Sequence, residues 1–379
     1  MIKTDCINFP LDRPCRFHKQ NGIKCVSCGH YAPVIPKNIK PYKILIIKLD
    51  AMGDVLRTTF LLPGLKKKYP NCKITWVSSA SSSEVLKGNP YIEHIWINDK
   101  HIFEKLLSEG FNEVINLDLS PASLALASMA AAKKITGYSL NSARQVVSSN
   151  HYAKHWLSMS AFDDLKKANK STYQYWISKI TGLKKPDYPI YVPIAADSAV
   201  RAGKFAVKHG LNNKLVVGIN PGAGKRWKMK RWTASGYLEI INKLHSRGAK
   251  VILLGGPEEE SIIRKMLKKS RGKAISAGTN NSIPDFFAFI NLCDMVITGD
   301  TMALHAALGL KKKAVAIFGP TSEPEIEMYG LGPKVVSGLP CVCCYRQTCD
   351  KKPDCMNSIK PGILWHVIEK SLPARPEKK

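Results

Sequence analysis

The chain has 379 residues, 45% of them hydrophobic, which predicts globular structure and suits two domains better than one. It contains no run of about 18 or more apolar residues and no apolar signal-peptide core near its start, so we expect no transmembrane helix and a cytoplasmic protein. The 57 Lys and Arg against 29 Asp and Glu give a net charge of +28, which indicates polyanionic partners such as nucleic acid, anionic lipid or a phosphorylated substrate.

Residues 1–40 form a separate segment that is rich in cysteine and ends in APVIPKNIKP, a proline-containing stretch typical of a linker. The segment is too short for a hydrophobic core, so a structural metal ion, Zn or Fe, would explain how it folds. Redox use of its CxxC pair is disfavoured, because the pair does not lie between a strand and a helix. The expected metal ligands are Cys6, Cys15, Cys25 and Cys28, with His18 and His30 as spare candidates.

From Tyr42 onward, short apolar segments alternate with helical ones. We expect strands at 43–49, 73–79, 92–98, 113–120 and 133–139. We expect helices at 54–70, kinked by Pro63, at 81–90, at 102–110, closed by Gly110, and at 122–132. Residues 150–212 are expected to form a mostly helical connector.

The alternation restarts at residue 214. We expect strands at 214–220, 250–256, 273–278, 294–299 and 313–319, and helices at 233–248, 257–272, 283–293 and 301–310. Such alternation predicts an α/β fold with two Rossmann-like, doubly wound domains that face a cleft. We place the first domain at 41–195, the second at 196–356, and a C-terminal helix and tail at 357–379.

Polar residues follow several of the predicted strands, at the ends where ligands bind in sheets of this kind. The stretch LDAMGDVLRTT puts Asp54 at a helix start, where the carboxylate either caps the helix or takes part in chemistry. The stretch GINPGAGKRW follows the first strand of the second domain. Its glycines would let backbone N–H groups approach a phosphate and its lysine would add charge, although an ordinary tight turn is an equal interpretation. The residues concerned are Gly222, Gly224 and Lys225.

Two further strand ends in the second domain carry polar residues. One has Asp300 and Thr301, with His305 a turn later, and the other has Gly319, Pro320 and Thr321. The plain alternative is that Thr301 caps a helix and His305 is a core histidine. Three polar strand ends in one domain favour a nucleotide-diphosphate site over three coincidences.

The motifs ILIIKLDAMGDVLRTT, GINPGAGKRW, ITGDTMALHAA and AIFGPTSEPE occur in an order and spacing that resembles glycosyltransferase family 9, the ADP-heptose lipopolysaccharide heptosyltransferases, over residues 42–370. The resemblance implies the GT-B fold and inverting, metal-independent transfer from a nucleotide-diphosphate sugar to a lipopolysaccharide-type or other surface-glycan acceptor. It also implies that the acceptor binds the N-terminal domain and the donor the C-terminal one. By motif position, Asp54 takes the catalytic-base role, Lys225 the donor-phosphate role, and Asp300, Thr301 and His305 lie at the diphosphate–sugar site.

One residue departs from the family pattern. The family commonly has Gly after the Asp-Ser/Thr pair, where this chain has Met302. A side chain there changes how closely the backbone approaches the donor, so another nucleotide sugar stays an alternative to ADP-heptose.

A second cysteine group lies near the C-terminus and contains the CxxC pair of Cys341 and Cys344. Four thiolates suit tetrahedral Zn or Fe, with a set of reduced, unligated thiols as the plain alternative. The group resembles the short Cys finger of some family relatives, including bacterial autotransporter heptosyltransferases, which bind iron there. The expected ligands are Cys341, Cys344, Cys349 and Cys355.

Function classes outside this family stay open at the level of sequence. The leading hypothesis is a cytoplasmic glycosyltransferase that is peripheral at an anionic membrane surface and binds no nucleic acid. A nucleic-acid-binding protein with zinc knuckles is the alternative of another class, but aromatic residues are not interleaved with most of the basic runs. A third hypothesis keeps the fold without the activity, with the Cys-rich ends serving protein contacts.

Overall fold

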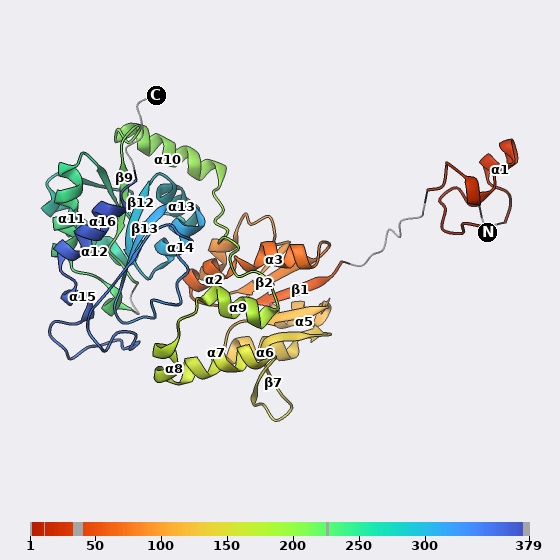
Figure 1. Cartoon of the computed structure of the whole chain (residues 1–379), viewed down its shortest axis with the longest axis horizontal. Coiled ribbons are helices and arrows are strands. Elements are labelled where there is room, and N and C mark those ends of the chain that lie inside the picture. Colours follow the sequence, from red (N-terminus) through yellow and green to blue (C-terminus); the bar gives the residue numbers. More distant parts are fainter. Residues whose placement is uncertain (1, 11, 33–40, 225–226, 374–379) are drawn as a thin grey trace. The chain divides into compact units, whose positions relative to one another are not determined.

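The computed structural model describes residues 2–10, 12–32, 41–224 and 227–373 (Figure 1). Contacts divide the chain into two compact units, Met1–Pro41 and Tyr42–Lys379, which are described separately here. None of the helices in the described ranges is both long enough and apolar enough to cross a membrane.

The first unit contains one short helix, α1 (Arg16–Asn21), and one 3-10 turn, η1 (Cys25–Ser27). Gly22 ends α1 in the left-handed conformation with φ 65°, and its N–H donates to the carbonyl of His18. No side chain among the described residues of this unit is buried. Turns and loops, rather than a packed core, therefore make up this unit.

The second unit contains two six-stranded sheets, each with its fourth strand beside its first (Figure 1). The first sheet has the order β3 (His94–Ile97), β2 (Lys73–Ser78), β1 (Lys43–Ile47), β5 (Glu113–Asn116), β7 (Ile135–Leu140) and β8 (Val146–Ser148). The second has the order β11 (Ala274–Ser276), β10 (Lys250–Leu253), β9 (Val216–Asn220), β12 (Met295–Gly299), β13 (Lys313–Phe318) and β14 (Lys334–Val336).

Both orders follow the classic Rossmann pattern, in which the strand order reverses beside the first strand. The pairings are parallel except for the hairpin of β7 and β8. The central strands β1 and β9 have the apolar runs KILII and VVGIN and are buried on both faces, as parallel strands covered by helices must be. The prediction of an α/β fold with two doubly wound sheets is therefore confirmed.

Helices cover both sheets. In the first half of the unit they are α2 (Met52–Thr58), α3 (Leu61–Lys68), α4 (Ala80–Ser83), α5 (Ile102–Ser108), α6 (Pro121–Met129), α7 (His151–Ala161), α8 (Asp163–Ala168) and α9 (Tyr173–Thr181), with the 3-10 turn η2 (Glu84–Leu86). In the second half they are α10 (Ala196–Lys208), α11 (Ala234–Ser246), α12 (Glu260–Ser270), α13 (Ile283–Asn291), α14 (Met302–Gly309), α15 (Cys355–Ser358) and α16 (Pro361–Ser371), with the 3-10 turns η3 (Lys228–Lys230) and η4 (Pro257–Glu259). A small separate ladder joins β4 (Gly110–Phe111) to β6 (Ala131–Ala132).

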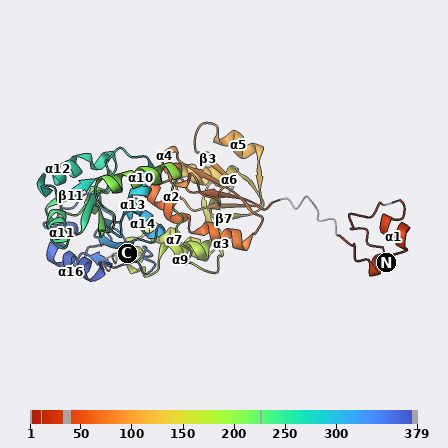
Figure 2. The same ribbon diagram turned by 90° about the horizontal axis from the view of Figure 1, so that it is seen from above.

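The two halves of this unit pack on each other through the helices that follow β1 and β12. Helix α2 contacts α14, and both views show them side by side (Figure 2). Gly53 lies at this contact: a Cβ added there would lie 3.4 Å from the His305 ring and 3.5 Å from the Met302 backbone. These are ordinary van der Waals distances, so the two helices are close enough for a single methyl group at residue 53 to span the contact.

One expectation for local structure is wrong. Gly110 does not close α5 but begins β4, since the helix already ends at the extended residue Glu109. The helix expected at 54–70 with a kink from Pro63 is interrupted at residues 59 and 60, which fits the clash of Pro63 with the carbonyl four residues before it. The connector 150–212 is mostly helical, as expected, with a non-helical stretch at 182–195.

Candidate active site

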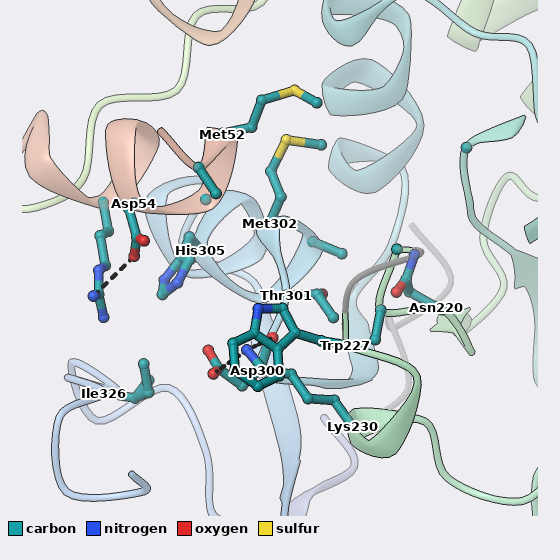
Figure 3. Close-up of a pocket in the computed structure, with 18 of the residues that line it drawn as sticks. Met52, Asp54, Asn220, Trp227, Lys230, Asp300, Thr301, Met302, His305 and Ile326 are labelled. Atoms are coloured by element: carbon teal, nitrogen blue, oxygen red, sulfur yellow. Dashed lines mark hydrogen bonds and ion pairs between the residues drawn. The ribbon is translucent and has the colours of Figure 1, made fainter. Parts of the chain in front are cut away.

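A cavity of about 600 Å³ is lined by residues that follow the first strands of both sheets. This is the edge where Rossmann-type sheets bind ligands, because the carboxyl ends of the strands beside the order reversal open there. Of the residues predicted as site residues, the cavity brings together Asp54, Gly222, Gly224, Asp300, Thr301 and His305. Figure 3 shows Asp54 and His305 on neighbouring helices, with Asp300 beyond them.

Asp54 lies in the first turn of α2, but it does not cap the helix. The N-cap residue is Ala51, and no side chain in the described part of the chain caps this end. Instead, the Asp54 carboxylate forms an ion pair with Arg57, at 2.8 Å from its Nη2. The Asp54 side chain keeps 40% of its surface exposed toward the cavity, whereas the Arg57 side chain keeps only 12%. The ion pair with Arg57 therefore fixes the Asp54 carboxylate, while part of its surface stays accessible from the cavity.

The charges around Asp54 keep it ionised. Burial alone would raise the pKa of Asp54, but the positive charges of Arg57 and Lys48, with His305, outweigh it, and the pKa lies below its usual value. Arg57 itself stacks on the Tyr173 ring, with the guanidinium carbon 3.9 Å from the ring centroid. Its buried Nε has no hydrogen-bond partner among the described atoms.

A second carboxylate near this strand end, Asp50, is engaged in other contacts. It accepts hydrogen bonds from the hydroxyls of Ser79 at 2.7 Å and Ser82 at 3.0 Å, and it is not among the described residues that line the cavity. Lys48, in contrast, is buried at the end of β1, where it pairs with Asp118 and donates to the backbone carbonyl of Asp50 at 2.8 Å. Asp54 is therefore the carboxylate that this strand end presents to the cavity.

Asp300 pairs with a lysine that the sequence analysis did not single out. Lys230 Nζ lies 2.8 Å from Asp300 Oδ2, and both side chains are mostly buried, at 15% and 17% exposure. Burial would raise the pKa of Asp300, but Lys230 and His305 outweigh it and lower the pKa to about 2. Lys230 belongs to the basic stretch KRWKMKR, and it lines the cavity.

Thr301 and His305 occupy the N-terminal half of α14. Thr301 is the N-cap residue, but its hydroxyl shares a hydrogen bond of 2.9 Å with Thr298 instead of capping the helix. His305 is buried, as a core histidine would be, yet it also lines the cavity. Burial and the nearby Arg57 charge lower the pKa of His305 to about 4, so the imidazole is neutral at pH 7.

Glu259 clamps the loop that contains Gly222 and Gly224. Its carboxylate accepts from the backbone N–H of Gly224 at 3.2 Å and from that of Gly256 at 3.1 Å. Gly222 faces the Glu259 side chain so closely that an added Cβ would lie 2.1 Å from its Cγ. Arg231 adds a hydrogen bond of 2.9 Å to the Gly224 carbonyl. Lys225, the predicted phosphate-binding lysine, lies outside the described residues.

The third strand end contacts the Cys-rich segment near the C-terminus. Gly319, Pro320 and Thr321 are not among the described residues lining the cavity; the carbonyls of Gly319 and Pro320 accept from the N–H groups of Cys343 and Tyr345, at 3.0 and 2.8 Å. This strand end thus holds the Cys-rich segment 341–355.

That segment reaches the cavity through Tyr345, whose hydroxyl accepts from the N–H of Ser322 at 3.1 Å. Lys166 of α8 lies 4.2 Å above the Tyr345 ring and also lines the cavity. Glu325 is a further carboxyl group there; burial and the nearby Asp300 raise its pKa, against the charges of Arg57 and Lys166.

The cysteine groups were expected to hold metal ions. All eleven cysteines are free thiols, and in the described ranges no three or more His, Cys, Asp or Glu side chains are arranged closely enough to hold a metal ion as they stand. In the C-terminal group, Cys344 and Cys349 lie near enough to Cys355 for their charges to act on it. Metal binding at Cys341, Cys344, Cys349 and Cys355 stays a prediction.

Six residues of this site were missed at the level of sequence. Three had a recognisable signal: a lysine directly after a buried strand, Lys48, a polar strand end, Asp118, and a cation three residues after Asp54 on the same helix, Arg57. The remaining three depend on distant segments that meet only in the fold, and no local pattern marks them. They are Lys230, Glu259 and Glu325.

Similar proteins share this architecture. Among curated relatives, lipooligosaccharide heptosyltransferase 2 of Campylobacter jejuni (strain 81116) is 31% identical over 42% of this chain and 52% of its own, so the match spans about half of that relative. Lipooligosaccharide heptosyltransferase 2 of Haemophilus influenzae is 24% identical over 74% of this chain and 84% of its own.

Solved structures agree on the fold. A glycosyl transferase family 9 protein of Veillonella parvula superimposes with a TM-score of 0.70 at 20% identity, covering 88% of this chain and 98% of the other. The E. coli ADP-heptose LPS heptosyltransferase II gives 0.65 at 16% identity, covering 87% and 98%. The iron-containing dodecameric glycosyltransferase TibC of enterotoxigenic E. coli gives 0.52 at 12% identity, covering 87% and 76%. These likenesses confirm the predicted GT-B fold.

The family model of glycosyltransferase family 9 (heptosyltransferase) matches residues 100–354. Those residues make up more than half of the 379 and include Asp300, Thr301 and His305 of the cavity. This chain therefore belongs to glycosyltransferase family 9.

Proposed function

We propose that this chain is an inverting glycosyltransferase that moves a sugar, heptose from ADP-heptose in the first instance, onto a lipopolysaccharide-type acceptor. The observation that carries the proposal is the shared cavity, in which an open carboxylate on α2 faces the strand ends of the second sheet. The first half then holds the acceptor and the second half the donor, with domain boundaries proposed at 195/196 and 356/357.

In the proposed reaction, an acceptor hydroxyl attacks the anomeric carbon of the donor sugar from the face opposite the diphosphate. The new bond joins the acceptor oxygen to the anomeric carbon, and the bond from that carbon to the diphosphate oxygen breaks. The electron pair leaves with the nucleoside diphosphate, and the proton of the hydroxyl goes to the Asp54 carboxylate. Arg57 supports this role because it holds Asp54 ionised and oriented at 2.8 Å.

The donor half has the groups that a nucleotide diphosphate needs. Lys230 contributes a cation and the start of α14 contributes backbone N–H groups, both beside the cavity. Glu259 accepts a hydrogen bond from the loop that contains Gly222 and Gly224, and Lys225 belongs to the same loop in the sequence. The predicted donor roles of Lys225, Gly319, Pro320 and Thr321 remain part of the proposal.

The identity of the sugar depends on Met302, which lines the cavity at the contact of the two helices (Figure 3). The named heptosyltransferase relatives favour heptose, whereas a thioether at this position favours a donor that tolerates an apolar neighbour. A nucleotide sugar other than ADP-heptose is therefore the second candidate donor.

The test is a thermal-shift experiment followed by a donor screen. ADP should raise the melting temperature of the purified protein, and an RNA oligomer of similar total charge should not. Release of free nucleotide is then followed with ADP-heptose and with other nucleotide sugars, in the presence of a deacylated lipopolysaccharide acceptor, and the anomeric configuration of the product is read by NMR.

Three results would contradict the proposal. Stabilisation by RNA but by no nucleotide would favour the nucleic-acid-binding class, and retention of the anomeric configuration would exclude single displacement with Asp54 as base. Nucleotide release at the same rate without acceptor would show hydrolysis in place of transfer.

A further inference from the structure

The first unit, residues 1–41, holds a defined fold without a hydrophobic core. None of its described side chains is buried, and its apolar residues Ile2, Ile7 and Val26 are 64%, 64% and 76% exposed. Apolar burial is the usual driving force for folding, and a segment of this length rarely supplies enough of it. Another interaction must therefore hold this unit together.

The four cysteines of the unit, all among the described residues, line one cavity, although no three of them are close enough to hold a metal ion as they stand. All four are half-buried, in a unit whose charged residues are exposed, and all four line one cavity of about 520 Å³. They come from three separate segments of the unit: the N-terminal loop, the start of α1, and the turn η1 with the residue that follows it. These are Cys6, Cys15, Cys25 and Cys28.

Backbone turns position three of the four cysteines. Carbonyls of Cys6 and Cys28 accept from the N–H groups three residues later, of Phe9 at 3.0 Å and Tyr31 at 3.3 Å, so each of these two cysteines begins a tight turn. Cys15 is the N-cap residue of α1, and its carbonyl accepts from Lys19 at 2.9 Å.

The two histidines at the same cavity are engaged elsewhere. The Nδ1 atom of His18 forms a hydrogen bond of 3.1 Å with the carbonyl of Ile23. The ring of His30 stacks on Phe17 with centroids 4.0 Å apart, and both histidines are exposed. The four thiols are thus the set of soft ligands that faces inward.

We propose that Cys6, Cys15, Cys25 and Cys28 bind one tetrahedral metal ion, Zn²⁺ or Fe²⁺, that replaces the missing core of this unit. Each thiol loses its proton to solvent on binding, and the segments that carry the four cysteines shift to bring the sulfurs around the ion, because no three of these described cysteines are close enough as they stand. The CxxC pair 25–28 has the spacing of two ligands on one turn, and Cys6 and Cys15 complete the set from the other side of the sequence. This proposal does not depend on the proposed transferase activity.

Elemental analysis of the full-length protein, purified without chelator and without a metal-affinity tag, tests the site. The wild type is compared with the double variant Cys25→Ser/Cys28→Ser, which leaves the C-terminal cysteines intact. The matched control is Cys72→Ala, because Cys72 is a buried core thiol of the second unit that lines neither cavity. We expect the double variant to lose about one metal ion per chain, and the control to lose none.

A second measurement on the wild type keeps the test sharp if the variant expresses poorly. Adding a strong chelator should speed proteolysis between residues 12 and 32 while leaving residues 42–224 protected, and added Zn²⁺ should restore protection. Equal metal content in the wild type and the double variant would overturn the proposal. So would two disulfide bonds among these cysteines in a peptide map made without reductant.

Discussion

At the scale of single residues, the neighbours of Asp54 determine the charge and the orientation of its carboxylate. Its pKa is lowered, so it is charged at neutral pH and ready to accept a proton. Asp54→Asn should leave stability near normal, because the carboxylate caps no backbone group, while transfer falls by ~10²–10⁴, the usual contribution of a general base. Initial rates at saturating donor, with a melting curve for each protein, measure both effects.

Glu325→Gln is the matched control, since Glu325 is another carboxyl group of the same cavity. A normal rate in Asp54→Asn together with a lost rate in Glu325→Gln would assign the base to Glu325 instead.

Arg57 should determine the pH at which the reaction rate falls on the acidic side of the pH–rate profile. A base works only when ionised, so the rate falls as the pH drops through its pKa. Arg57→Gln removes the cation 2.8 Å from Asp54 and raises that pKa, so the fall in kcat/KM should begin at a higher pH than in the wild type. Arg57→Lys keeps the charge, so the pH at which kcat/KM falls should stay near that of the wild type. If kcat/KM falls at the same pH in both variants, Arg57 does not have this role.

The two lysines of the donor loop, by which we mean residues 222–231, can be compared directly. Lys230→Ala removes a mostly buried cation beside Asp300, and Lys225→Ala removes the cation predicted from the sequence motif. Each should weaken ADP binding and slow transfer by ~10²–10³ if its charge stabilises the leaving diphosphate. Calorimetric titration with ADP and nucleotide-release rates provide the readout. An unchanged rate and an unchanged ADP affinity in either variant would remove that lysine from the site.

At the scale of elements, the donor loop depends on Glu259, and Gly222 is the position that tests this. Gly222→Ala would place a Cβ 2.1 Å from the Glu259 Cγ and displace the carboxylate from the N–H groups of Gly224 and Gly256. Losing two such hydrogen bonds should lower ADP affinity roughly 10- to 100-fold. Titration with ADP and circular dichroism check affinity and fold.

Gly203→Ala in α10 is the matched control for that substitution, because nothing lies within 4 Å of an added Cβ there. It should leave ADP affinity unchanged and stabilise the helix by roughly 0.5–1 kcal/mol. Normal ADP binding in Gly222→Ala would show that the Glu259 clamp is dispensable.

The sheets were predictable because buried parallel strands have a signal of their own: runs such as KILII and VVGIN between turns leave few alternatives. Strand β14 escaped prediction, because KVV is short and lies between glycine- and proline-containing loops. The end of α5 at Glu109 has the same explanation. Gly110 pairs with β6 as part of β4, and a pairing between segments about 20 residues apart cannot be predicted from the neighbouring sequence alone.

The site was predictable only where a motif lies along the chain. Asp54, Asp300 and His305 follow strands in sequence, so strand-end reasoning finds them. Lys230 and Glu259 act across loops that are joined only by the fold, at distances of 2.8 Å to Asp300 and 3.2 Å to Gly224. Their partners are 70 and 35 residues away, beyond the reach of periodicity or spacing.

At the scale of the whole molecule, the net charge of +28 remains the dominant feature. We expect peripheral binding to anionic vesicles that weakens as salt rises, because exposed charges more than about 8 Å apart are largely screened at physiological ionic strength. Co-sedimentation with phosphatidylglycerol vesicles over a salt series measures this. Neutral phosphatidylcholine vesicles are the control, and binding that is flat across the series would rule out an electrostatic attachment.

The contact of α2 with α14 also constrains how the two halves can move. A rotation that preserves this contact would have its axis close to Gly53, and displacement in any rotation grows with distance from the axis. Asp54 and His305 lie beside this contact, whereas Lys166 and Tyr345 lie on other elements of the cavity wall. Such a rotation would widen the cavity around Lys166 and Tyr345 while it kept Asp54 and His305 close together.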